Sequence, residues 1–275
     1  INGENHAAFT GGGITQGFTA DGIDYARGDD RDAIRFKSHF RDLIFIHTTP
    51  TTPGYFIVND KVEGLNNTDK VKVYFHPSSE NSIEQTEFKK EYTAPIDHKA
   101  SLPLTKATFY YLTSPDEVNI EKSISAVQDR YPGYPDHNRL ESIYNIKNES
   151  TQVSITTIIF PNSNLVPKPN FEKIPSENFD GVKIPYNSCT DYIIATKKTP
   201  VEVETFSAAG EFIWCRKESN NINSFFVESG TIFLDNGFGF ESDSPLTIYV
   251  KGSKGVIISK GAKLKLNGSK LSAVS

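Results

Sequence analysis

Leu43-Ile44-Phe45-Ile46 and Tyr55-Phe56-Ile57-Val58 are two short apolar runs, and they indicate the fold class of this chain. Between them lies Thr48-Thr49-Pro50-Thr51-Thr52-Pro53-Gly54, whose prolines and glycine are typical of a turn. We therefore predict a β-hairpin over 43–58 with both faces of its strands covered. Downstream, Val71-Lys72-Val73-Tyr74-Phe75-His76 alternates as a half-buried strand does.

The rest of the chain has the composition of β-strands separated by turns, because Phe, Tyr, Ile, Val and Thr are abundant and turn residues recur at short intervals. Tight turns are predicted at 228–231 and 235–240. Further strands are predicted at 107–112, 153–160, 191–195, 201–206, 211–216, 224–228, 231–234, 246–250, 255–259 and 263–266. The pattern indicates an all-β fold, a large antiparallel β-sandwich of stacked sheets in two lobes.

Two stretches interrupt this pattern. Ser114-Pro115-Asp116-Glu117 resembles a helix cap, with Ile120, Ile124 and Val127 at helical spacing, so a short helix stays open there. Residues 168–180 read as a long loop. Strands of the same texture lie on both sides of this loop, so we predict one domain over 1–275 with a seam near 168–180.

The charge and hydrophobicity of the chain limit the classes of molecule that it is expected to bind. With 29 Lys and Arg against 34 Asp and Glu, the net charge of -5 argues against a nucleic-acid partner, which usually requires a basic face. An anionic glycan remains compatible, because a local cationic groove can lie on an acidic protein. The chain has no apolar run of the ~18 residues that a membrane-spanning helix needs.

The chain holds no Met and begins at Ile1, which leads us to expect a processed or excised product whose targeting segment lies upstream. Its two cysteines, Cys189 and Cys215, fit no zinc or redox motif. The sequence is compatible with two alternatives: a disulfide between them in an oxidising compartment, or two buried free thiols.

Few side chains in this sequence are spaced in a way that predicts a metal, catalytic or binding site. The six histidines lack the spacing of a zinc-binding pair, and His76 at a strand end is better explained as an ordinary strand-end residue than as a ligand or base. Trp214 and Phe212 lie in an apolar strand and are assigned to the core. Tyr131 and Tyr134 flank Pro132-Gly133 in a loop and are the candidate sugar-binding residues.

One stretch resembles a known family. It contains, in order, Tyr25-Ala26-Arg27-Gly28-Asp29, Phe40-Arg41-Asp42-Leu43-Ile44-Phe45-Ile46, Tyr55-Phe56-Ile57-Val58-Asn59-Asp60-Lys61-Val62-Glu63-Gly64 and Val73-Tyr74-Phe75-His76. This resembles the C-terminal β-sandwich of heparinase II/III-like polysaccharide lyases. The opening Ile1-Asn2-Gly3-Glu4-Asn5-His6 is similar to a strand segment of that family, with His6 where Gln is usual. The likeness covers about the first 80 residues.

The resemblance implies an α/α toroid followed by antiparallel sheets, and β-elimination from uronic-acid-containing glycans. The family's catalytic Tyr and His and its metal-site motif would all fall N-terminal to Ile1. We therefore assign no catalytic residue, metal ligand or cofactor to this chain, while the parent protein is expected to bind a divalent metal such as zinc through upstream ligands. Asn2, Glu4 and His6 would lie near the former active-site face.

The resulting expectation is a secreted or periplasmic β-sandwich domain that supports an N-terminal catalytic domain or chain and forms one wall of an anionic-polysaccharide cleft. Elimination needs a base, an acid and a charge sink for the carboxylate, and the sequence groups no such set. Two alternatives stay open: an independent carbohydrate-binding module, and a non-catalytic surface domain with a purely structural role.

Overall fold

The computed structural model describes residues 12–30, 38–76, 84–85, 91–96, 105–123, 137–146, 151–163, 165–258, 263–267 and 272–273. Every helix or strand that it describes is a β-strand, and almost every pair of neighbouring strands runs antiparallel. The predicted all-β class is confirmed. No helix long and apolar enough to cross a bilayer occurs in this part of the chain.

The chain folds into two compact units. The first comprises Ile1–Gly17, Ile23–Thr48 and Pro53–Lys168, and the second comprises Phe18–Gly22, Thr49–Thr52 and Pro169–Ser275. Whether the two fold as one domain, as the sequence suggests, stays a prediction.

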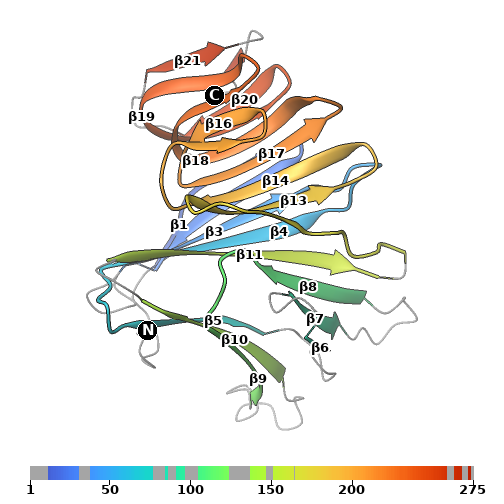
Figure 1. The fold of residues 1–275 in the computed structure, drawn as a ribbon, viewed down its shortest axis with the longest axis vertical. Helices are drawn as coiled ribbons and strands as arrows, with labels where there is room; N and C mark the ends of the chain where they lie inside the picture. Colours follow the sequence, from blue (N-terminus) through green and yellow to red (C-terminus); the bar gives the residue numbers. More distant parts are fainter. Residues whose placement is uncertain are drawn as a thin grey trace. The chain divides into compact units, whose positions relative to one another are not determined.

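The first unit contains a three-stranded sheet and an eight-stranded sheet, apart from the last three residues of the strand β1 (Figure 1). The large sheet has the order β1 (Gly13–Ala20), β2 (Ile23–Asp29), β3 (Ser38–Ile46), β4 (Tyr55–Glu63), β11 (Gln152–Asn162), β8 (Thr105–Tyr111), β7 (Glu91–Ile96) and β6 (Glu84–Gln85). The small sheet has the order β5 (Lys70–Phe75), β10 (His137–Asn145) and β9 (Glu117–Ser123). A two-residue Asp21-Gly22 turn, with Gly22 at φ 101°, joins β1 to β2.

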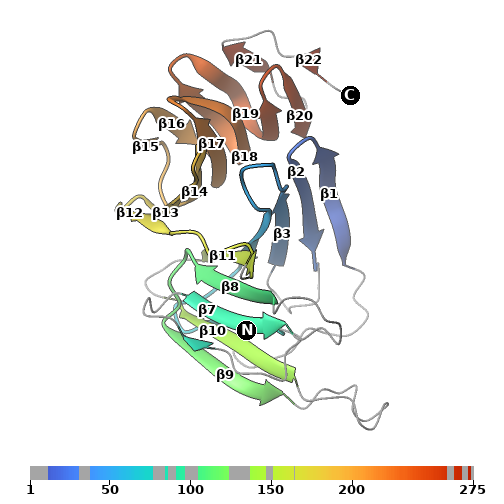
Figure 2. The same cartoon turned by 90° about the vertical axis from the view of Figure 1, so that its right-hand side faces the viewer.

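The two sheets of this unit stack as a sandwich (Figure 2). Val62 of β4 and Ile155 of β11 pack with Val71, Val73 and Tyr144 of the small sheet. A neighbouring cluster joins three residues of β8 to Leu140 of β10. Successive residues of a strand point to opposite faces of its sheet, so every second side chain of these strands points into the sandwich.

The hairpin formed by β3 and β4 buries one face more completely than the other. Ile44, Tyr55 and Ile57 are fully buried on the first face. On the second face Leu43 is 45% exposed, and Phe45 and Phe56 stack at 4.6 Å while only half-buried. The expectation that both faces are covered is therefore wrong here. The described contacts of the small sheet are with β4, β11 and β8, so the β3 side of this face lacks that cover.

The second unit is built on an eleven-stranded sheet. Its main path runs β12 (Glu172–Ile174), β13 (Phe179–Pro185), β14 (Cys189–Thr196), β17 (Phe212–Glu218), β18 (Asn221–Asp235), β19 (Phe238–Lys251), β20 (Lys254–Ile258) and β22 (Ser272–Ala273). Beside this path lie β15 (Val201–Val203), β16 (Phe206–Ala209) and β21 (Leu264–Asn267). Phe225, Phe233 and Phe240 stack within its core. Trp214 and Phe212 are 1% and 0% exposed, so their assignment to the core is confirmed.

Several local predictions need correction. The turn predicted at 228–231 is an irregularity inside β18, where Ser229 takes φ 48° and the register with β19 shifts. The strand predicted at 201–206 divides into β15 and β16, because Glu204 adopts a positive φ of 48°. Residues 117–123 form β9 rather than part of a helix, and the predicted loop at 168–180 contains β12. The turn at 235–240 is confirmed, with Asn236 and Gly237 both at positive φ.

Candidate functional site

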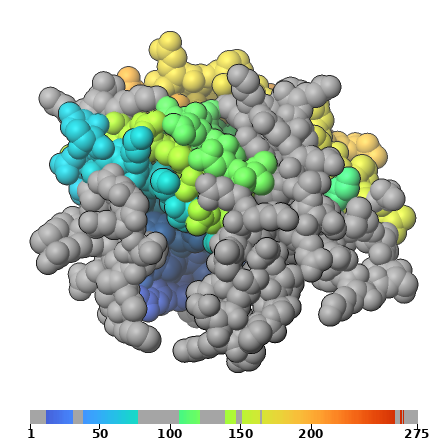
Figure 3. Space-filling view, turned by 90° about the horizontal axis from the view of Figure 1, so that it is seen from below, coloured from blue at the N-terminus to red at the C-terminus, as the bar shows by residue number. Residues whose placement is uncertain are grey.

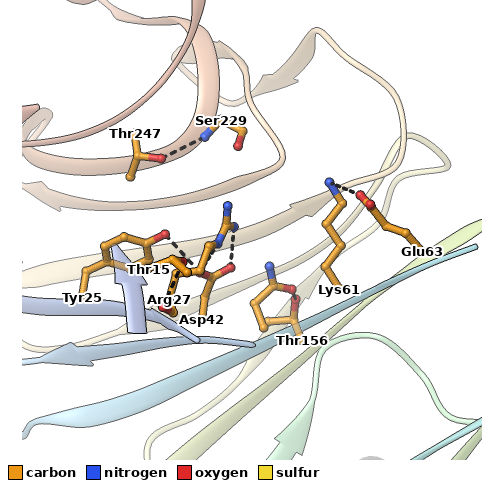
Figure 4. A network of polar contacts seen from close by, with 10 residues as sticks. Thr15, Tyr25, Arg27, Asp42, Lys61, Glu63, Thr156, Ser229 and Thr247 are labelled. Atoms are coloured by element: carbon orange, nitrogen blue, oxygen red, sulfur yellow. Dashed lines mark hydrogen bonds and ion pairs between the residues drawn. The ribbon is translucent and has the colours of Figure 1, made fainter. Parts of the chain in front are cut away.

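An ion pair joins β2 and β3 of the large sheet. Asp42 of β3 stands directly opposite Arg27 of β2, and its two carboxylate oxygens each accept a 2.8 Å hydrogen bond from the guanidinium (Figure 4). Tyr25 donates a third hydrogen bond of 3.0 Å to the same carboxylate. Asp42 is completely buried. A buried carboxylate requires this degree of pairing, because removing it from water is otherwise strongly unfavourable.

A second pair repeats the arrangement on the opposite face of the sheet. Asp60 of β4 faces Arg41 of β3 and accepts two hydrogen bonds from it, at 2.7 and 3.0 Å. His39 lies 2.7 Å from the same carboxylate through Nε2. Burial opposes ionisation of Asp60, but the hydrogen bond from His39 and the charge and hydrogen bonds of Arg41 outweigh it, so the pKa of Asp60 lies below its usual value.

Polar contacts continue around these pairs. The backbone and ring of His39 both contact the Asp30 carboxylate, at 3.1 and 3.3 Å. Thr156 of β11 donates a 3.0 Å hydrogen bond to the buried Asn59 of β4. On the face that carries Arg27 and Asp42, polar contacts therefore extend from β2 and β3 to β4 and β11, and Figure 4 shows part of them.

The second unit contains a pair of the same design. Arg216 of β17 donates hydrogen bonds of 2.6 and 2.8 Å to Asp191, its direct neighbour on β14. The guanidinium also lies over the Trp214 ring, 5.5 Å from its centroid. Both charged residues are buried.

These geometries favour a structural role for the pairs. A carboxylate that is held by a bidentate guanidinium has both oxygens engaged in charge-assisted hydrogen bonds within the fold. Each pair joins two adjacent strands and fixes their register.

A different polar cluster lies on the outer face of the small sheet. Glu141 of β10 accepts 2.9 Å hydrogen bonds from Lys72 of β5 and Asn119 of β9. Tyr74, next to it on β5, is 37% exposed, and the Arg139 guanidinium lies 5.0 Å from the centroid of its ring. In Figure 3 atoms in the colours of β5, β10 and β9 reach this surface.

The residues of this cluster, which we call the Tyr74 face, shift one another's pKa. Burial opposes ionisation of Glu141, but hydrogen bonds from Asn119, Lys72 and Tyr74 outweigh it and lower its pKa. Burial and the same carboxylate raise the pKa of Tyr74. The face thus presents an aromatic ring, cations and amide groups, the side chains that contact sugar rings and their hydroxyl groups.

The residues proposed from sequence are distributed as follows. Asn2, Glu4, His6, Tyr131 and Tyr134 lie outside the described residues, so their roles stay predictions. His76 is exposed, with its ring 6.5 Å from that of Tyr74. The described residues include no group of three or more His, Cys, Asp or Glu side chains arranged to hold a metal ion.

The cysteines are two free thiols. Cys215 pairs with Tyr192 across β17 and β14, and Cys189 lies three residues before Tyr192, so the two thiols point to opposite faces of the sheet. The disulfide left open by the sequence is therefore not formed.

The ion pairs were not predicted from the sequence, although the sequence carries a signal for them. Asp42 stands in phase with the buried Ile44 and Ile46, and Asp60 stands in phase with Val58 and Val62. A charged residue at an apolar-phase position of a strand predicts a buried partner on the next strand.

Comparisons with known proteins give a fold likeness. No protein-family model and no curated protein sequence matches the chain. A crystal structure of a mutant of the heparan sulfate lyase HepC from Pedobacter heparinus is similar with a TM-score of 0.49 and 13% sequence identity. The match covers 70% of this chain and 29% of that chain, so the matched part spans less than a third of that chain. A likeness at this level concerns the course of the backbone and carries no information on activity.

Proposed function

We propose that the chain is the C-terminal β-sandwich part of a polysaccharide lyase that acts on uronic-acid-containing glycans by β-elimination. In this proposal it supports an N-terminal helical catalytic domain, forms one wall of the glycan cleft and functions outside the cytoplasm. Any divalent metal of the parent protein would be bound by residues upstream of this chain.

The ion pairs of the large sheet are the observation that favours a supporting role for this chain. Within the stretch that resembles the lyases, Arg27 is paired with Asp42, and Arg41 and His39 are paired with Asp60. These charges fix the register of β2, β3 and β4 and are engaged in the folded state. A structural role in the sheet therefore accounts for the charged residues of this stretch.

The isolated chain tests this proposal. It should fold cooperatively and yield no unsaturated uronate when incubated with heparin, heparan sulfate or alginate, as followed by ultraviolet absorbance. Steady product formation that increases with the concentration of the purified chain, and persists in the presence of a chelator, would overturn it.

A second candidate function, glycan binding in its own right, is favoured by the Tyr74 face. An exposed tyrosine ring beside Arg139, Lys72 and Asn119 offers both a stacking surface and hydrogen-bond donors. In native gels that contain heparin or alginate, Tyr74→Ala should abolish retardation of the chain, and Tyr74→Phe should retain it because the ring is kept. Equal retardation of both variants and the unmodified chain would exclude Tyr74, and the Tyr131→Ala and Tyr134→Ala variants would then test the loop predicted from sequence.

A further inference from the structure

Among the described terminal strands of three or more residues, the edge strand β1 differs from the others in composition. It is the terminal strand of the eight-stranded sheet, where β2 is its described neighbour. Its sequence, Gly-Ile-Thr-Gln-Gly-Phe-Thr-Ala, contains no charged residue and no proline over eight residues. Most of its residues are exposed, and Ile14 is 78% exposed.

The other terminal strands of three or more residues in the described sheets carry charges. β5 contains two lysines, β9 contains two glutamates and a lysine, and β12 contains a glutamate and a lysine. Charged side chains on an edge oppose pairing with another molecule, because they would have to lose water or face one another. The edge strand β1 lacks this protection.

The composition of β1 also favours pairing. Ile, Phe and two Thr give it high β-propensity, and an uncharged strand of this kind is a template for a further strand. An antiparallel pair made of two copies of one strand is symmetric about a two-fold axis, so each copy offers the same backbone groups to the other. No like charges would meet across such an axis in β1.

We propose that β1 pairs antiparallel with β1 of a second copy of this chain, so that two eight-stranded sheets join into one across a two-fold axis. The partner is thus this protein itself, and the contact is made by backbone hydrogen bonds with Ile14 packing beside them. This inference is independent of the proposed function.

Analytical ultracentrifugation across a wide range of concentration tests the pairing. We expect a reversible monomer–dimer equilibrium whose dissociation constant rises by about tenfold or more in Ile14→Lys. Leu165→Lys is the matched control, because Leu165 is also an apolar residue with about the same exposure, 80%, and lies outside any strand. Circular dichroism and thermal melting would check that each variant is folded, and Thr15→Lys would replace Ile14→Lys if that variant is not.

Hydrogen exchange supplies the second readout. Backbone amides of Gly13–Gly17 should become more protected as the concentration of the chain rises, and this gain should disappear in the β1 variant. A chain that stays monomeric at every concentration would overturn the proposal. Equal weakening of the dimer by Ile14→Lys and Leu165→Lys would overturn it too, because it would show association through general surface hydrophobicity.

Discussion

Arg27 and Asp42 face each other on neighbouring strands, and both carboxylate oxygens of Asp42 accept hydrogen bonds from the Arg27 guanidinium. The pair occupies positions that the alternation of β3 would otherwise assign to apolar side chains. Charge at such a position is stable only with its partner in place, so the pair specifies which strands lie side by side.

Acid should weaken the protein through Asp60. Because its pKa is lower in the folded state than in the unfolded chain, its contribution to stability is present above the unfolded value of about 3.9 and is lost as the pH falls through the folded pKa. Asp60→Asn should be less stable near neutral pH by about 1–3 kcal/mol, since Arg41 and His39 lose the negative charge and one of the two acceptor oxygens that they contact. Urea unfolding at a series of pH values should show this difference shrinking in acid, and a constant difference would contradict the assignment.

Core substitutions should reveal the asymmetry of the β3–β4 hairpin. Ile57→Ala should lower the free energy of unfolding by about 2–5 kcal/mol, because Ile57 is fully buried. Phe45→Ala should have a smaller effect, about 1–2 kcal/mol, because its ring is half-buried against Phe56. Urea titration of both variants is the measurement, and an effect of Phe45→Ala as large as that of Ile57→Ala would mean that this face is covered.

The hairpin also illustrates what the sequence can predict. Apolar runs and their turn predicted both strands, since these patterns are local. The coverage of each face depends on where a distant sheet packs, and no local pattern encodes that. Charge pairs such as Asp191 with Arg216 join residues 25 positions apart, so the sequence marks the charged positions in phase with the core without naming the partners. The Tyr74 face was not predicted, because its residues come from three strands that are separated in the sequence, β5, β9 and β10.

The two thiols should react only after unfolding. Burial is the main cause of the raised pKa of Cys215, and burial together with the nearby Asp191 carboxylate raises that of Cys189. A thiol reagent should therefore modify both cysteines rapidly in denaturant and neither rapidly in the native protein. A reducing agent should leave the melting temperature unchanged. A melting temperature that falls on reduction would indicate a disulfide and contradict the arrangement on opposite faces.

If Arg27 and Asp42 serve the fold as a pair, a double-mutant cycle on the two residues should show it as a coupling free energy. Free energies of unfolding would be measured for Arg27→Met, Asp42→Leu and the double variant, with the exposed pair Glu241 and Lys265 as control. Each single substitution should cost about 3–5 kcal/mol, because Arg27→Met leaves the fully buried Asp42, and Asp42→Leu leaves the largely buried Arg27, without its charged partner. The double variant should recover about 2–3 kcal/mol relative to the sum, and the control pair should couple by less than about 1 kcal/mol. Additivity at Arg27 and Asp42 within about 0.5 kcal/mol would mean that the two residues do not act as a pair.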